Sequence, residues 1–118
     1  MWKYYNANSL GNSVNDCVVR AISLAEDKSW DETYRELSEI ARKEGILLDD
    51  VSFVENYLDK RYRRACHYAK TVDEFAKEHS KGTYLVTMQG HITAIIDGII
   101  YDTFDCSNRR MWCAWKVK

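Results

Sequence analysis

The stretch GHITAIIDGIIYD, residues 90–102, predicts a β-hairpin. At its centre lies Asp97-Gly98, one of the strongest two-residue hairpin signals, because both residue types tolerate the positive φ that a type I′ turn requires. Apolar and β-branched residues flank the turn on both sides, as is typical of strands. A two-residue turn fixes the register, and this register places Thr93 opposite Asp102. The second half of the chain should therefore contain an antiparallel sheet.

The same register nominates a histidine–aspartate pair. Side chains alternate between the faces of a strand, so His91 and Thr93 share a face with Asp102. His91 and Asp102 are then diagonal neighbours, roughly 7 Å apart at the backbone and within side-chain reach. Asp105 falls on the opposite face. A carboxylate beside an imidazole fixes its tautomer and stabilises its protonated form, so we expect Asp102 to orient His91.

Helical periodicity dominates the first half of the chain, and short β-type runs dominate the second. Ser29 with Glu32, and Thr71 with Glu74, have the spacing of capping boxes. We predict a single α+β domain over residues 1–118, with N-terminal helices packed on a C-terminal antiparallel sheet. The expected helices are 16–26, 29–44, 50–60 and 71–81, and the expected strands are 63–68, 83–88, 91–96, 99–104 and 111–117.

Cys17 falls in the first turn of the first predicted helix. Backbone N–H groups are unpaired there and the helix dipole is positive, which favours a thiolate. A thiolate facing a histidine–aspartate pair is suited to attack on a carbonyl carbon. Taken singly, Cys17, His91 and Asp102 are each typical of ordinary structural residues. Their predicted joint placement favours the chemical interpretation.

Composition argues against several other classes. The 118 residues include 17 basic and 18 acidic side chains, a net charge of −1, so no nucleic-acid partner is expected. The longest apolar runs are about five residues, against roughly 20 for a membrane span, so no membrane association is expected. The N-terminus lacks the pattern of a signal peptide, which predicts a cytoplasmic protein with its cysteines as free thiols.

A metal site is the least favoured hypothesis. Cys66, His67, Cys106 and Cys113 supply ligand types, but no Cys-x-x-Cys pair occurs and adjacent residues of a strand point to opposite faces. We therefore expect no metal and no cofactor.

The segment NDCVVRAI, residues 15–22, resembles the nucleophile helix of papain-like cysteine peptidases. Its Asp-Cys pair is most similar to the bacteriocin-processing peptidase domains of peptide exporters. Residues 90–98 and 101–103 resemble the histidine strand and the strand of the third catalytic residue, in the same chain order. The whole sequence also resembles small proteins of phages and their bacterial hosts that share an NDCxxRA start. This second resemblance implies no particular activity.

The peptidase resemblance implies a papain-like fold and a thiol peptidase or amidase, or a related acyl transferase, acting on a peptide or protein. Cys17 would be the nucleophile, His91 the general base and then acid, and Asp102 the orienting residue. Such enzymes place an oxyanion-binding glutamine five or six residues before the nucleophile. Asn12 stands there in this chain, and Asn15 is a second candidate donor.

Arg20, one turn after Cys17, has two interpretations. It is either a candidate substrate-binding residue or the partner of a carboxylate on a neighbouring element. The function also has an alternative: a catalytically inactive peptidase-like binding module, such as a phage protein that binds and inhibits a host factor. The reactivity of Cys17 discriminates between the enzyme and the binding module.

Overall fold

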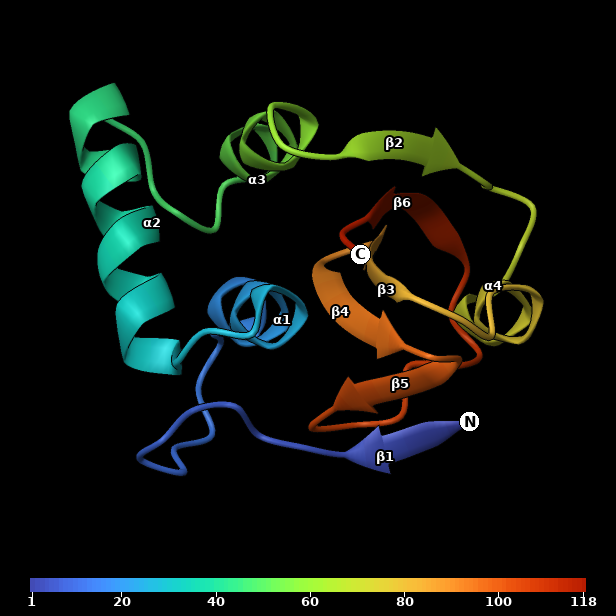
Figure 1. Ribbon diagram of the computed structural model, residues 1–118. Helices are drawn as coiled ribbons and strands as arrows, with labels where there is room; N and C mark the ends of the chain where they lie inside the picture. The colour runs from blue at the N-terminus through green and yellow to red at the C-terminus, as the bar shows by residue number, and fades with distance from the viewer.

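A six-stranded mixed sheet carries helices on both faces in the computed structural model, which describes residues 1–118 (Figure 1). The structure is a compact α+β domain, as the sequence predicts. Its elements in chain order are β1 (Trp2–Tyr4), α1 (Cys17–Glu26), α2 (Trp30–Glu44), α3 (Val51–Asp59), β2 (Arg63–Cys66), α4 (Val72–Glu78), β3 (Thr83–Met88), β4 (His91–Ile96), β5 (Ile99–Asp102) and β6 (Met111–Lys116).

The hairpin of β4 and β5 forms in the predicted register. Ile96 pairs with Ile99 and Ala94 with Tyr101, so the ladder continues toward Thr93 and Asp102. The turn residues Asp97 and Gly98 have φ of 50° and 79°, as a type I′ turn requires. The turn chemistry read from the sequence therefore determines which residues of the two strands face each other.

The sheet differs from the prediction in its first strand and in its strand order. The prediction of a wholly antiparallel, C-terminal sheet is wrong, because β1 at the N-terminus pairs in parallel with β5. The order is β1-β5-β4-β3-β6-β2, so β6 is inserted between β3 and β2. The three residues of β1 are too few to show a periodicity, and their pairing with β5 spans nearly the whole chain.

Two apolar cores lie on opposite faces of the sheet. The larger core joins α1, α2 and α3 to one face, and Ile22, Leu37 and Trp115 are fully buried in it. The smaller core packs α4, through Phe75, against the other face. Helix α1 lies between α2 and β4, so it is covered on both sides (Figure 1). This central position fixes where α1 begins and hence where Cys17 lies.

The helix starts agree with the predicted caps, with one difference of detail. Thr71 forms a complete capping box with Glu74 at the start of α4. At the start of α2, Ser29 Oγ accepts a hydrogen bond from the Glu32 N–H at 3.0 Å, which is one half of the predicted box. Both helices thus begin within one residue of the predicted position.

The expectation of four free thiols is wrong for two of the cysteines. Cys66 on β2 lies directly opposite Cys113 on β6, with Cα atoms 3.9 Å apart, and the two form a disulfide. Cys17 and Cys106 remain free. The expectation rested on the cellular compartment alone. It could not take account of the pairing of β2 with β6, which brings together residues 47 positions apart.

Replacing Gly98 by alanine should destabilise the domain more than the same change at Gly45. Both residues have positive φ, which costs a side chain roughly 1–2 kcal/mol. An added Cβ at Gly98 would also lie 3.3 Å from the Ala76 carbonyl oxygen, whereas the space at Gly45 is open. Urea denaturation of the two variants measures the difference. Equal losses of unfolding free energy would contradict the close packing described for this turn.

Candidate active site

Cys17 is the first residue of α1 and is partly exposed. The N-cap of this helix is Asp16, but the Asp16 carboxylate makes no hydrogen bond to the helix N–H groups. The donors of the first turn are therefore left uncapped beside the thiol. Cys17 sits in the positive field of a helix N-terminus with free backbone donors next to it.

His91 and Asp102 are in direct contact, as the hairpin register predicts. The distance from His91 Nε2 to Asp102 Oδ2 is 2.6 Å, and the two side chains are 5% and 2% exposed. Phe104 packs on the imidazole, with ring centroids 4.7 Å apart. The imidazole is thus held by a carboxylate on one side and an aromatic ring on another, which restricts its orientation.

Cys17 and His91 both line one cleft, so the thiol and the imidazole face the same space. The thiol and the imidazole interact there, and such contacts commonly tighten further when a substrate is bound. The structure therefore brings together the three residues that the sequence nominated, Cys17, His91 and Asp102, from α1, β4 and β5.

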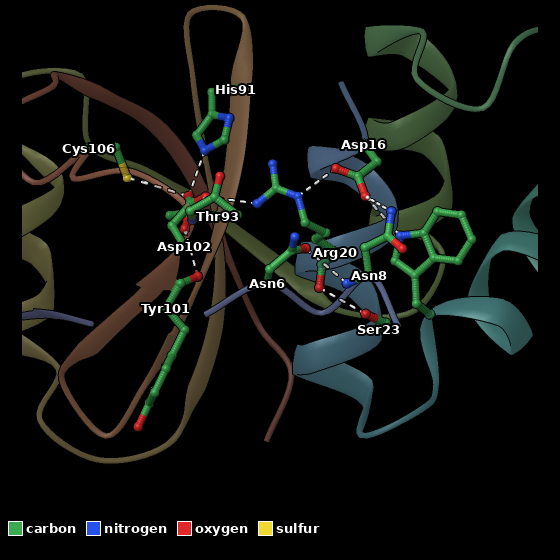
Figure 2. A network of polar contacts seen from close by, with 12 residues as sticks. Asn6, Asn8, Asp16, Arg20, Ser23, His91, Thr93, Tyr101, Asp102 and Cys106 are labelled. Carbon is green, nitrogen blue, oxygen red and sulfur yellow. Dashed lines mark hydrogen bonds and ion pairs between the residues drawn. The ribbon is translucent and has the colours of Figure 1, made fainter. Parts of the chain in front are cut away.

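Arg20 binds two buried carboxylates. Its Nε donates to Asp16 Oδ1 at 2.6 Å, and its Nη1 donates to Asp102 Oδ1 at 2.9 Å. The Arg20 side chain is 11% exposed, and it lies between the sheet and the start of α1 (Figure 2). Of the two interpretations of Arg20, the structure places it as the partner of neighbouring carboxylates, with two nitrogens already engaged.

Asp16 is the centre of a further set of contacts that the sequence did not reveal. Its Oδ2 accepts hydrogen bonds from Trp30 Nε1 at 3.0 Å and from Asn8 Nδ2 at 3.3 Å. A continuous chain of polar contacts therefore runs from α2 through Asp16, Arg20 and Asp102 to the imidazole (Figure 2). The one sequence signal of this chain is the four-residue spacing of Asp16 and Arg20 on a helix.

The charges of the site favour a thiolate beside an imidazolium. Burial alone would lower the pKa of His91, but its hydrogen bond with Asp102 raises that pKa well above its usual range. Burial alone would raise the pKa of Cys17, but the interaction with His91 outweighs it and the pKa is lowered. The pKa of Asp102 is lowered too, because the contacts with His91 and Arg20 outweigh its burial.

The two asparagines nominated as oxyanion donors lie in different places. Asn15 lines the cleft together with Cys17 and His91. Asn12 is exposed, lies outside this cleft, and its backbone carbonyl accepts a hydrogen bond from Asn6 Nδ2 at 3.2 Å. The geometry thus reverses their predicted order and makes Asn15 the stronger candidate.

Cys106 is a further residue of the site that sequence reasoning did not place there. It is fully buried, and its Sγ lies 3.8 Å from Asp102 Oδ2. Ligand-type atoms of His91, Asp102 and Cys106 all lie within 4.8 Å of one another. The carboxylate oxygen of this group is already hydrogen-bonded to the imidazole, and Arg20 supplies a positive charge. The three residues therefore form a hydrogen-bonded cluster. The positive charge of Arg20 beside it disfavours a bound cation.

The chain matches no protein-family model, no curated protein and no solved structure. None of its helices has the length and apolar character needed to cross a membrane.

Arg20→Met should lower the free energy of unfolding by roughly 3–5 kcal/mol, because it leaves Asp16 and Asp102 buried without their cation. Arg35→Met is the matched control. Arg35 pairs with Asp31 on the exposed face of α2, and the two side chains are 79% and 64% exposed. The control should cost less than about 1 kcal/mol. Chemical denaturation compares the two variants, and similar losses would contradict the structural role of Arg20.

The stability of the protein should fall as the pH drops below about 5. The pKa of Asp102 is lower in the folded than in the unfolded chain, so its stabilising effect is present above the unfolded pKa and lost on acidification. Asp102→Asn should make the unfolding free energy less dependent on pH between about pH 5 and pH 2. An unchanged slope in Asp102→Asn would contradict this assignment.

Proposed function

We propose that this protein is a thiol hydrolase with a papain-like arrangement, a peptidase or amidase or a related acyl transferase. Cys17 is the nucleophile, and Asp102 orients His91. His91 takes the thiol proton as general base and then, as general acid, gives that proton to the leaving amine. The observation that carries the proposal is the meeting of a helix-start thiol with a carboxylate-bound imidazole in one cleft. This constellation suits nucleophilic attack on an acyl carbon.

The reaction proceeds through an acyl-enzyme. The Cys17 thiolate attacks the carbonyl carbon of an amide, and a C–S bond forms as the carbonyl oxygen takes the negative charge. The intermediate collapses, the C–N bond breaks, and His91 donates its proton to the departing amine. Water, deprotonated by His91, then attacks the thioester and releases a carboxylic acid and the free thiolate. An amine acceptor in place of water would give acyl transfer.

The oxyanion donors come from the start of α1. The uncapped N–H groups beside Cys17 point along the helix axis, where they suit a developing negative charge. Asn15 supplies an amide N–H from the wall of the same cleft. Because Asp16 is bound to Arg20, Trp30 and Asn8, its carboxylate does not compete for these donors.

Arg20 acts as a positioning residue in this mechanism. It occupies Asp102 Oδ1 and leaves Oδ2 for the imidazole, so the carboxylate presents a single oxygen to His91. The positive charge of Arg20 also helps to keep Asp102 ionised. An ionised Asp102 in turn stabilises the imidazolium that forms when His91 takes a proton.

Alkylation of Cys17 by iodoacetamide should be fast well below about pH 8, because the His91 imidazolium lowers the pKa of the thiol. In His91→Ala the rate should fall and follow the titration of an ordinary thiol. The labelled peptide is identified by mass, with Cys17→Ser as the control for labelling elsewhere. If Cys17 reacts like a free thiol with or without His91, the enzyme proposal fails and a binding module is favoured.

Asn15→Ala should slow the hydrolysis of p-nitrophenyl acetate by on the order of 10²-fold in kcat, the usual effect of losing one oxyanion donor. Asn12→Ala is the matched control and should leave kcat nearly unchanged, because Asn12 lies outside the cleft. A large loss in Asn12→Ala with none in Asn15→Ala would contradict the placement of the donor.

A further inference from the structure

The cleft that Cys17 and His91 line also has walls that the chemical step itself does not use. It has a volume of about 140 Å³ and lies between the start of α1, helix α3 and the turn from β3 to β4. Its deepest walls are apolar: Val54, Met88 and Ile92 are each no more than 5% exposed. A group attached to the reacting carbonyl would therefore find an apolar surface directly next to the thiol.

The volume of the pocket is large enough for one side chain of moderate size. A cavity of about 150 Å³ accommodates benzene, so roughly five or six non-hydrogen atoms fit in this volume. Trp112 forms one flat wall, while Val51 on α3 is 60% exposed at the mouth. A linear aliphatic stem could lie along these walls with its end near the solvent.

Apart from the paired Cys17 and His91, the charged residues that line the pocket are negative. Two carboxylates, Asp49 and Glu55, are among its lining residues, and no lysine or arginine is. The cation nearest to Glu55 is Arg64, at 3.6 Å, but Arg64 binds Asp59 more closely, at 2.7 Å and 3.0 Å. Asp49 is exposed and forms no ion pair within the chain. The rim thus offers negative charge above an apolar interior.

We propose that this pocket receives a side chain with an aliphatic stem and a cationic end, lysine or arginine, next to the bond that Cys17 attacks. The stem packs on the apolar walls, and the charged end reaches the rim carboxylates, as long basic side chains do at other apolar surfaces. This inference rests on the proposed thiol chemistry and adds the substrate class to it.

Two alkylating probes of equal length test this inference without assuming which side of the scissile bond the pocket serves. N-(5-aminopentyl)chloroacetamide carries a lysine-like cationic tail, and N-hexylchloroacetamide carries a neutral one. Each forms a C–S bond with the Cys17 thiolate and releases chloride. At low ionic strength the cationic probe should label Cys17 roughly two- to fivefold faster, the upper part of the range that exposed ion pairs provide. Added salt should reduce this ratio.

The double variant Asp49→Asn with Glu55→Gln should bring the ratio of the two rates close to one. Glu44→Gln, a change of the same kind at an exposed residue outside the pocket, should keep the wild-type ratio. Equal rates of the two probes in the wild-type protein, or a preference that persists in the double variant, would overturn the inference.

Iodoacetamide, which carries no tail, distinguishes a failure of the proposed thiol chemistry from a failure of the proposed substrate class. If Cys17 reacts fast with iodoacetamide in a His91-dependent way but does not discriminate between the tails, the thiol chemistry stands and the substrate class is wrong. If the reaction with iodoacetamide is that of an ordinary thiol, both the proposed function and this inference fail.

Discussion

The Asp102 carboxylate is the group on which the rest of the site depends. It is 2% exposed and is shared between two basic side chains, with Oδ2 contacting His91 Nε2 and Oδ1 accepting from Arg20 Nη1. A charge buried this deeply is tolerated only when it is paired and hydrogen-bonded. Asp102 therefore requires a cation from α1 and a donor from β4 at the same time, and it fixes the helix relative to the hairpin.

This requirement extends to β1 and to α2. The backbone carbonyl of Asp102 accepts the Tyr5 N–H at 2.8 Å, directly after β1, so the N-terminal strand holds the backbone that carries the carboxylate. Within α1, Arg20 also forms an ion pair with Asp16, and Asp16 accepts a hydrogen bond from Trp30 on α2. The start of α1 is therefore anchored without a side-chain cap, which leaves the first N–H groups and Cys17 facing the cleft.

The local part of this arrangement could be predicted from the sequence. The Asp97-Gly98 turn fixes the register of the hairpin, and the register brings His91 to Asp102. The bounds of β3 and β4 also follow from their composition. Such features depend on residues close in sequence, where turn chemistry and periodicity decide the structure.

The parts that could not be predicted depend on contacts between distant segments. No local pattern reveals that β1 pairs with β5, that Cys66 lies opposite Cys113, or that Arg20 reaches across to Asp102. The apolar pocket also depends on distant segments, because its lining residues come from α1, α3, β3, β4 and β6. The pocket therefore forms only in the folded chain.

The most direct test of the central claim is the protonation state of His91 in the resting protein, read from the ring ¹⁵N chemical shifts of labelled histidine. His67 and His79 are distinguished by substitution. At about pH 8, well above the usual histidine pKa of about 6.5, both ring nitrogens of His91 should still carry protons, as an imidazolium held between Asp102 and the Cys17 thiolate. A neutral His91 ring that titrates near the usual value would contradict the account.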